Sequence, residues 1–176
     1  MIRLILPLAF LAFFTASCSN SSKSDSSDET EATVEEHVAI DDQHASADAV
    51  TAYMILKEAM VSSNAETGAD AAKVLSEEMQ KLAGTDSIAN VIIVASDSLS
   101  MSSDLEMQRS AFQIISDNLY IYLKENGYGR EIYHQRCPMA FNNRGAFWLS
   151  DKEEIENPYL PETMLKCGQN VEILEL

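Results

Sequence analysis

The sequence is poor in basic residues and in cysteine, and each shortage excludes a class of function. Only 12 lysine and arginine residues stand against 28 acidic ones, and the formal net charge at pH 7 is −16. Such a charge repels the phosphate backbone of nucleic acids, so we expect no nucleic-acid binding. The three cysteines form no C-x-x-C pair, and the sequence contains no H-E-x-x-H motif, phosphate loop or nucleophile motif. We therefore do not expect an enzyme.

The N-terminal residues are typical of an exported protein. Arg3 supplies a positive charge, residues 4–14 form an apolar run too short to span a bilayer as a mature helix, and residues 15–17 are small. We expect residues 1–17 to be a signal peptide. Cys18 follows directly, as in the box where bacterial lipoproteins are cleaved and acylated, and is the expected lipidation site. The alternative is ordinary cleavage after Ser17, without a lipid.

Residues 18–48 are expected to be a lipid-anchored, acidic and disordered tether. The stretch is rich in serine and acidic residues and has no aromatic residue, so it cannot bury enough apolar surface to offset its chain entropy. We thus expect a periplasmic or outer-membrane lipoprotein of a bacterium, held to the membrane by its lipid alone. Lipidation of Cys18 leaves Cys137 and Cys167 as an even pair in a compartment where disulfides are permitted.

Amphipathic helical patterns dominate residues 49–126. Apolar residues recur at spacings of three and four in residues 49–63, 71–82 and 88–99, and the longest stripe runs from Leu105 to Asn126-Gly127. The third pattern contains a Val-Ile-Ile-Val run that would also suit a buried strand, but its length favours a helix. The capping residues that we expect are Asp86 for the third helix and Ser102 or Ser103, with Glu106, for the fourth. The methionines that we expect to fill the core are Met54, Met60, Met79 and Met107.

Residues 127–176 differ from the helical part in composition. Runs at 131–133 and 146–149 predict extended segments, an Asn/Gly-rich turn lies at 142–145, and Pro161 predicts a short helix that stops at Gly168. The predicted domain, residues 49–176, is therefore mainly α. It is an up-and-down four-helix bundle (49–126) followed by a small C-terminal lobe of extended segments and a short helix (127–176).

Two cysteine/methionine pairs stand out in this lobe. Pro138 disfavours a helix at Cys137, so Cys137 and Met139 are expected on extended chain, pointing the same way. Met164 and Cys167 are three residues apart, a spacing that puts both on one face of a helix. Thiolate and thioether sulfur together select Cu(I), or its congener Ag(I), over hard cations. If the two segments pack together, a four-sulfur metal site results.

The spacing of these residues is also compatible with other sites. His134 is a lower-ranked additional ligand, because an extended segment sends it to the face opposite Cys137. Zinc held by Cys137, Cys167 and His134 is a weaker alternative, since methionine is a poor zinc ligand. A structural disulfide between the two cysteines would stabilise the lobe by about 2–4 kcal/mol. Spacing alone does not decide between a disulfide and a metal site.

The C-terminal stretch resembles a known family. The sequences CPMAFNNRGAFWLS (137–150), EIENPY (154–159) and MLKCG (164–168) are similar to the family named domain of unknown function 3347, DUF3347. Its members are exported helical domains of bacteria, standing alone or fused to periplasmic adaptor subunits of heavy-metal efflux pumps. The resemblance therefore implies copper or silver handling.

Carried over residue by residue, the family's sulfur positions fall on the two cysteine/methionine pairs. The family often has a histidine directly before the first cysteine, where this chain has Arg136. Trp148 belongs to the resembling stretch and could shield a bound cation, or it could be a core residue. The expected function is a Cu(I)- or Ag(I)-binding lipoprotein domain that sequesters copper or passes it to an efflux adaptor or copper-enzyme assembly partner. The alternative is a metal-free scaffold lipoprotein with a structural disulfide.

Overall fold

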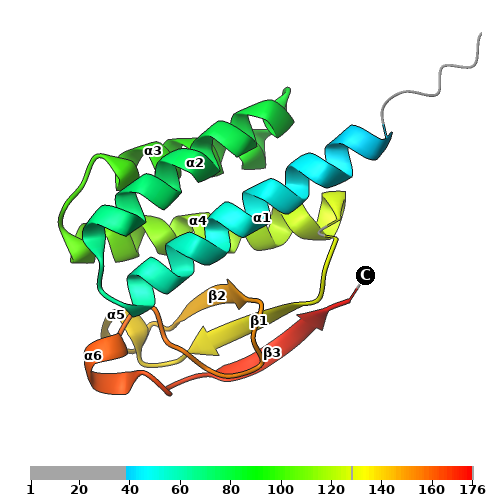
Figure 1. Ribbon diagram of the computed structural model, residues 1–176. Coiled ribbons are helices and arrows are strands. Elements are labelled where there is room, and N and C mark those ends of the chain that lie inside the picture. The colour runs from blue at the N-terminus through cyan, green and yellow to red at the C-terminus, as the bar shows by residue number, and fades with distance from the viewer. Residues whose placement is uncertain (1–38, 128, 176) are drawn as a thin grey trace, which may run out of the picture. The chain divides into compact units, whose positions relative to one another are not determined.

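The computed structural model describes residues 39–127 and 129–175, with side chains from residue 47 onward. The predicted signal peptide, Cys18 and most of the predicted tether lie outside the described residues. Four long helices come first: α1 (Ala39–Val61), α2 (Ala65–Ala83), α3 (Ser87–Ser100) and α4 (Leu105–Asn126). Each packs mainly against its neighbours in sequence across short turns, and a small lobe follows them (Figure 1). The mainly α fold is as predicted.

The helix boundaries differ from the predicted ones at several ends. α1 begins at Ala39, inside the segment that we expected to be disordered, so that expectation was wrong for residues 39–48. α2 begins at Ala65 because the Asn64 side chain accepts a hydrogen bond from the backbone N–H of Thr67 at 3.0 Å. No described helix is both long and apolar enough to cross a membrane.

The predicted cap of α3 is confirmed, and that of α4 was placed too early. Asp86 accepts hydrogen bonds from the backbone N–H groups of Ile88 and Ala89. Asp104 caps α4 in the same way, whereas the Ser102 hydroxyl accepts from the Asp104 N–H. Aspartate and serine are comparable N-caps, so the residue closest to the helix start takes the role.

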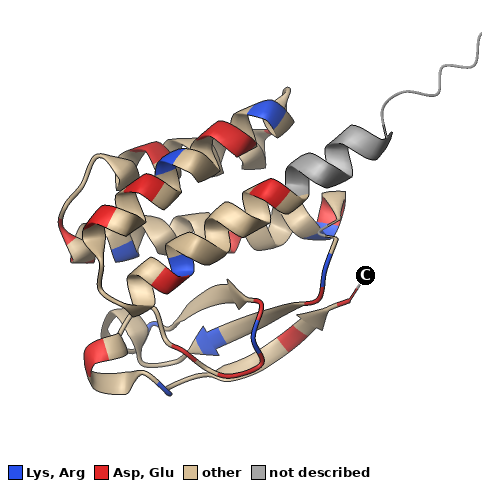
Figure 2. Cartoon of the chain, in the orientation of Figure 1, with Lys and Arg blue, Asp and Glu red and all other residues tan. Residues whose placement is uncertain are grey.

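Apolar stripes of the four helices form the core. Those of α4 are fully buried at Phe112, Ile115 and Leu119, as the pattern predicts. The methionines buried among them are Met54, Met60 and Met79. Met107 is 62% exposed, because it lies in the first turn of α4 on the outward side, so its predicted core position was wrong. Acidic residues are distributed along the four helices (Figure 2).

The lobe contains a three-stranded antiparallel sheet in the order β2-β1-β3. Its strands are β1 (Ile132–Cys137), β2 (Ala146–Ser150) and β3 (Gln169–Leu174). The first two match the predicted extended segments, whereas β3 was not predicted. Two single-turn helices complete the lobe, α5 (Ala140–Asn143) and α6 (Pro161–Met164). α6 begins at Pro161 as predicted but ends at Met164, before Gly168.

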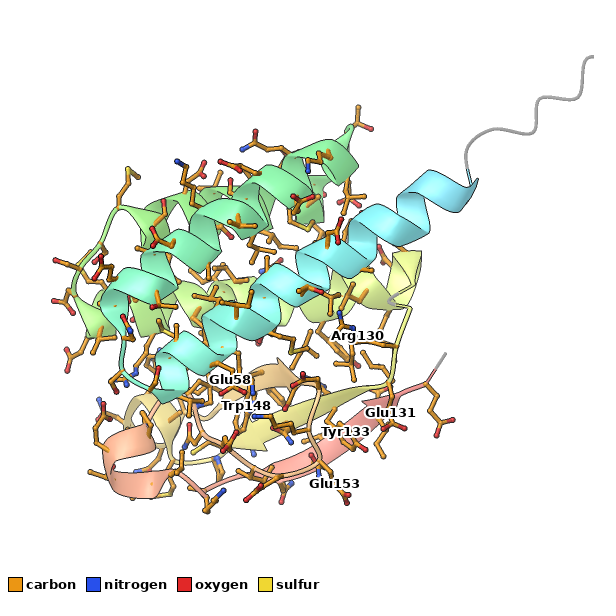
Figure 3. All side chains as sticks on the ribbon, viewed as in Figure 1. Glu58, Arg130, Glu131, Tyr133, Trp148 and Glu153 are labelled. Atoms are coloured by element: carbon orange, nitrogen blue, oxygen red, sulfur yellow. The ribbon has the colours of Figure 1, made fainter. Side chains whose placement is uncertain are left out.

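Hydrogen bonds join the lobe to the helices. The Tyr53 hydroxyl of α1 accepts from the backbone N–H of Leu149 in β2 at 3.0 Å and pairs with the Ser116 hydroxyl of α4 at 2.7 Å. At the other end of the lobe, Arg130 points towards α1 (Figure 3) and donates to the Thr51 hydroxyl at 2.7 Å. Bundle and lobe thus share one core.

Candidate functional site

The structure brings the two predicted cysteines into contact. Cys137 is the last residue of β1 and is fully buried, and Cys167 follows α6 and is partly buried. Their Sγ atoms are 3.3 Å apart, and both are free thiols. A disulfide bond is about 2.05 Å long, so the two sulfurs touch without being bonded.

Met139 and Met164 lie beside this thiol pair, but not in the conformations that spacing predicted. Met139 has φ −89° and ψ −15°, a turn after β1, so the prediction of extended chain was wrong there. The physical reason is that Pro138 is also well suited to the second position of a turn. Met164 is the last residue of α6, and its carbonyl accepts a hydrogen bond from the Cys167 N–H at 2.9 Å.

Both methionine side chains reach solvent, whereas their backbones adjoin Cys167. Met139 is 43% exposed and Met164 39% exposed. The backbone N–H of Met139 donates a hydrogen bond towards the Cys167 sulfur. The arrangement is therefore a half-covered thiol pair with a methionine on each of the two segments that carry it. Two thiols in contact are soft donors, which suit a soft, low-charge cation.

The thiol pair would need only a small opening to hold a metal. With metal–thiolate bonds of about 2.3 Å in tetrahedral geometry, two sulfurs lie about 3.8 Å apart. Among the residues that the structure describes, no group of three or more histidine, cysteine, aspartate or glutamate side chains could hold a metal ion. A metal at Cys137 and Cys167 would thus need methionine sulfur or an external ligand to complete its coordination.

The environment of Cys167 favours its protonated form. The hydrogen bond with Cys137, burial and the charge of Cys137 raise the pKa of Cys167, and the Met139 N–H opposes them. Because metals bind thiolates, metal binding here would release protons.

His134 lies on the face of β1 opposite Cys137. Its ring is stacked between those of Tyr120, at 4.0 Å, and Phe147, at 4.9 Å, and only 8% of the residue is exposed. Burial lowers the pKa of His134, and the carboxylate of Glu172 acts against this shift. The structure therefore does not bring His134 to the thiols.

Trp148 packs against the segment that carries Cys167. It is fully buried within the lobe (Figure 3) and meets the Tyr159 ring edge-on at 6.1 Å. A Cβ added to Gly168 would lie 2.9 Å from Trp148 Cη2, so the chain next to Cys167 runs directly over the indole. Trp148 is thus a core residue that packs against Gly168, the residue after Cys167.

Asn157 is a residue whose contribution spacing did not reveal. It is fully buried; its backbone N–H donates to the Leu165 carbonyl at 2.8 Å, and its side-chain amide donates to the Met164 carbonyl at 3.3 Å. Its side-chain oxygen accepts from the Tyr159 N–H at 3.0 Å. Its position between Glu156 and Pro158 gives no sign of this role in the sequence.

Comparison with known proteins gives a family match for part of the chain. The family model described as "Protein of unknown function (DUF3347)" matches residues 49–131, which run from α1 to the start of β1. The match therefore lies on the helices, whereas our resemblance rested on residues 137–168. No curated protein and no solved structure matches this chain. The match over residues 49–131 supports the resemblance of this chain to the DUF3347 family.

Proposed function

We propose that this protein is an extracytoplasmic lipoprotein domain that binds Cu(I), or Ag(I), and either sequesters it or passes it to an efflux or copper-enzyme assembly partner. The observation that carries the proposal is the contact between the Cys137 and Cys167 thiols, with Met139 and Met164 on the same two segments. Two thiolates with thioether neighbours form a ligand set that favours Cu(I) over hard cations.

The surroundings of the thiols add two features that a metal-transfer site needs. Cys137 is buried, which shields a bound ion from water on one side, whereas Cys167 and the methionines face solvent, from which an ion can arrive. Because both thiols must lose their protons, the affinity for Cu(I) should fall as pH drops. The association of the DUF3347 family with efflux adaptors supports the same assignment.

The test is an anaerobic Cu(I) titration against a competing chelator. The variants are Cys137→Ser/Cys167→Ser, which removes both thiols, and Met139→Leu/Met164→Leu, which removes both thioethers. Met107→Leu is a matched control, because Met107 is also an exposed methionine but lies in the first turn of α4. We expect the double serine variant to lose competition and the double leucine variant to weaken it. Equal competition by the wild type and the double serine variant would refute the copper site.

The lipid anchor is a separate part of the proposal. Cys18 follows a signal-peptide-like stretch, and its acylation would hold the domain at a membrane surface. Cys18→Ser should release the protein from the membrane fraction and abolish incorporation of a labelled fatty acid. Continued fatty-acid labelling of this variant would refute the anchor without touching the copper proposal.

The second candidate is a metal-free scaffold lipoprotein with a structural Cys137–Cys167 disulfide. The observation that favours it is the 3.3 Å separation, from which a movement of little more than 1 Å closes the bond. A thiol assay on protein isolated from its native compartment distinguishes the two functions. Cysteines that stay oxidised in the presence of copper and a mild reductant favour the scaffold.

A further inference from the structure

Arg109 of α4 binds three segments of the chain at once. Its Nε donates to the Pro158 carbonyl at 3.0 Å, and its Nη2 donates to the Ser63 hydroxyl at 2.8 Å and to the Met60 carbonyl at 3.3 Å. The same Nη2 lies 3.0 Å from a carboxylate oxygen of Glu162. With its side chain only 12% exposed, Arg109 ties the end of α1 to the segment that leads into α6.

That segment carries Cys167. Asn157 directly precedes Pro158, and its side-chain amide donates a hydrogen bond to the Met164 carbonyl. The same carbonyl accepts a hydrogen bond from the Cys167 N–H. These hydrogen bonds, together with the peptide bond between Asn157 and Pro158, connect the guanidinium on α4 to the backbone of Cys167.

Cys137 is fixed by a different route. It ends β1, which pairs with β2, with Cys137 opposite Ala146. β2 is bound to the helices through the Leu149 N–H and the Tyr53 hydroxyl. β1 also pairs with β3, with Arg136 opposite Gln169, two residues after Cys167. Cys167 is therefore held to β1 by the sheet on its C-terminal side and to the helices by the contacts of Arg109 on its N-terminal side.

We propose that Arg109 is a positioning residue for the Cys137/Cys167 pair, acting through the backbone carbonyls that it binds and not through its ion pair. The biological meaning of this inference rests on the proposed copper function. The effect of Arg109 on the distance between the two thiols does not depend on that function. Arg109 lies within the residues matched to DUF3347 and Cys167 lies outside them, so this contact links the family's helices to the sulfur pair.

The chemistry of the ion pair supports this division. Glu162 is 56% exposed, and an exposed carboxylate contributes little through a salt bridge. The carbonyls of Met60 and Pro158 cannot turn to water in the same way, because their donor, the guanidinium, is largely buried with them. Loss of Arg109 would therefore free the segment before α6 and give Cys167 more positions relative to Cys137.

The experiment measures how strongly the fold holds the two thiols together. The protein is equilibrated with oxidised and reduced glutathione, so that two protein thiols and one glutathione disulfide exchange with one protein disulfide and two glutathione thiols. The equilibrium constant reports the effective concentration of one thiol at the other and needs no copper. The variants are Arg109→Met, Arg109→Lys and Glu162→Gln, each checked for its fold by circular dichroism.

We expect Arg109→Met to lower the constant about tenfold, the factor for releasing roughly one residue's backbone from a fixed conformation. Arg109→Lys, which keeps a donor, should recover part of the loss, and Glu162→Gln should change the constant less than about twofold. If Arg109→Met does not fold, Arg109→Lys must still lower the constant below that of the wild type.

Three results would overturn the inference: an unchanged constant in a folded Arg109→Met variant, an unchanged constant in Arg109→Lys if only that variant folds, or an equal effect of Glu162→Gln. A Cu(I) titration of the same proteins separates this inference from the proposed function. If the wild type binds no Cu(I) while Arg109→Met lowers the constant, the copper function fails and the positioning role stands.

Discussion

Replacing Tyr53 by phenylalanine tests the attachment of the lobe to the helices. The change removes one oxygen from a fully buried side chain and leaves the Leu149 N–H without its acceptor. An unpaired buried donor costs about 1–3 kcal/mol. The Ser116 hydroxyl loses the same partner but can turn to the carbonyl one helical turn earlier, which reduces its share. We therefore expect a loss of about 2 kcal/mol in the free energy of unfolding.

Urea denaturation followed by circular dichroism measures this loss, and a thermal melt should show a fall of roughly 8 °C. The matched control is Tyr120→Phe. The Tyr120 hydroxyl donates to Glu172 at 2.6 Å but lies near the surface, where water replaces it, so the expected loss is below about 0.5 kcal/mol. Equal losses in the two variants, or less than about 0.5 kcal/mol for Tyr53→Phe, would refute the account of a buried joint.

Three further predictions concern pH and packing. Because burial lowers the pKa of His134, this residue takes up a proton in the unfolded chain at a higher pH than in the folded protein. The free energy of unfolding should therefore decrease as pH falls below about 6.5. His134→Phe should flatten this dependence in urea denaturations between pH 7 and 5. Burial raises the pKa of both Tyr53 and Tyr159, so these phenols ionise at a lower pH in the unfolded chain than in the folded protein. Stability should therefore decline as pH rises above about 10, which tyrosine absorbance and circular dichroism can follow. Gly168→Ala places a methyl group 2.9 Å from Trp148 Cη2, and we expect a loss of about 1–3 kcal/mol in urea denaturation together with a lower glutathione equilibrium constant.

Each of these has an outcome that contradicts it. A stability slope between pH 7 and 5 that His134→Phe leaves unchanged would place the pH dependence on other groups. Tyrosine ionisation near pH 10 in the folded protein would mean that the buried phenols are accessible. Gly84→Ala provides a comparison for Gly168→Ala, because no atom lies within 4 Å of a Cβ added at Gly84. Any loss of stability in Gly84→Ala therefore comes from the positive φ of 45° alone.

Local patterns were sufficient for the helices and for part of the lobe. Apolar spacing predicted the buried faces of the four helices, because a helix that packs on one side repeats its apolar residues every three or four positions. β3 escaped prediction because most of its side chains are exposed, so no buried/exposed alternation marks it. Met139 was misplaced because the same proline suits both an extended chain and a turn.

The sequence alone determined which residues form the sulfur pairs and which residues lie next to them in the chain. A cysteine before a proline, a methionine three positions before a second cysteine, and an excess of acidic residues are properties of the chain in any conformation. The contact between Cys137 and Cys167 was decided only by the tertiary structure, because it depends on the pairing of β1 with β3 and on contacts between other segments distant in sequence. Strand alternation already placed His134 on the face opposite Cys137, whereas its enclosure between aromatic rings of α4 and β2 depends on the tertiary structure. Spacing acts over a few residues, whereas the separation of two thiols depends on how whole segments are attached to a shared core.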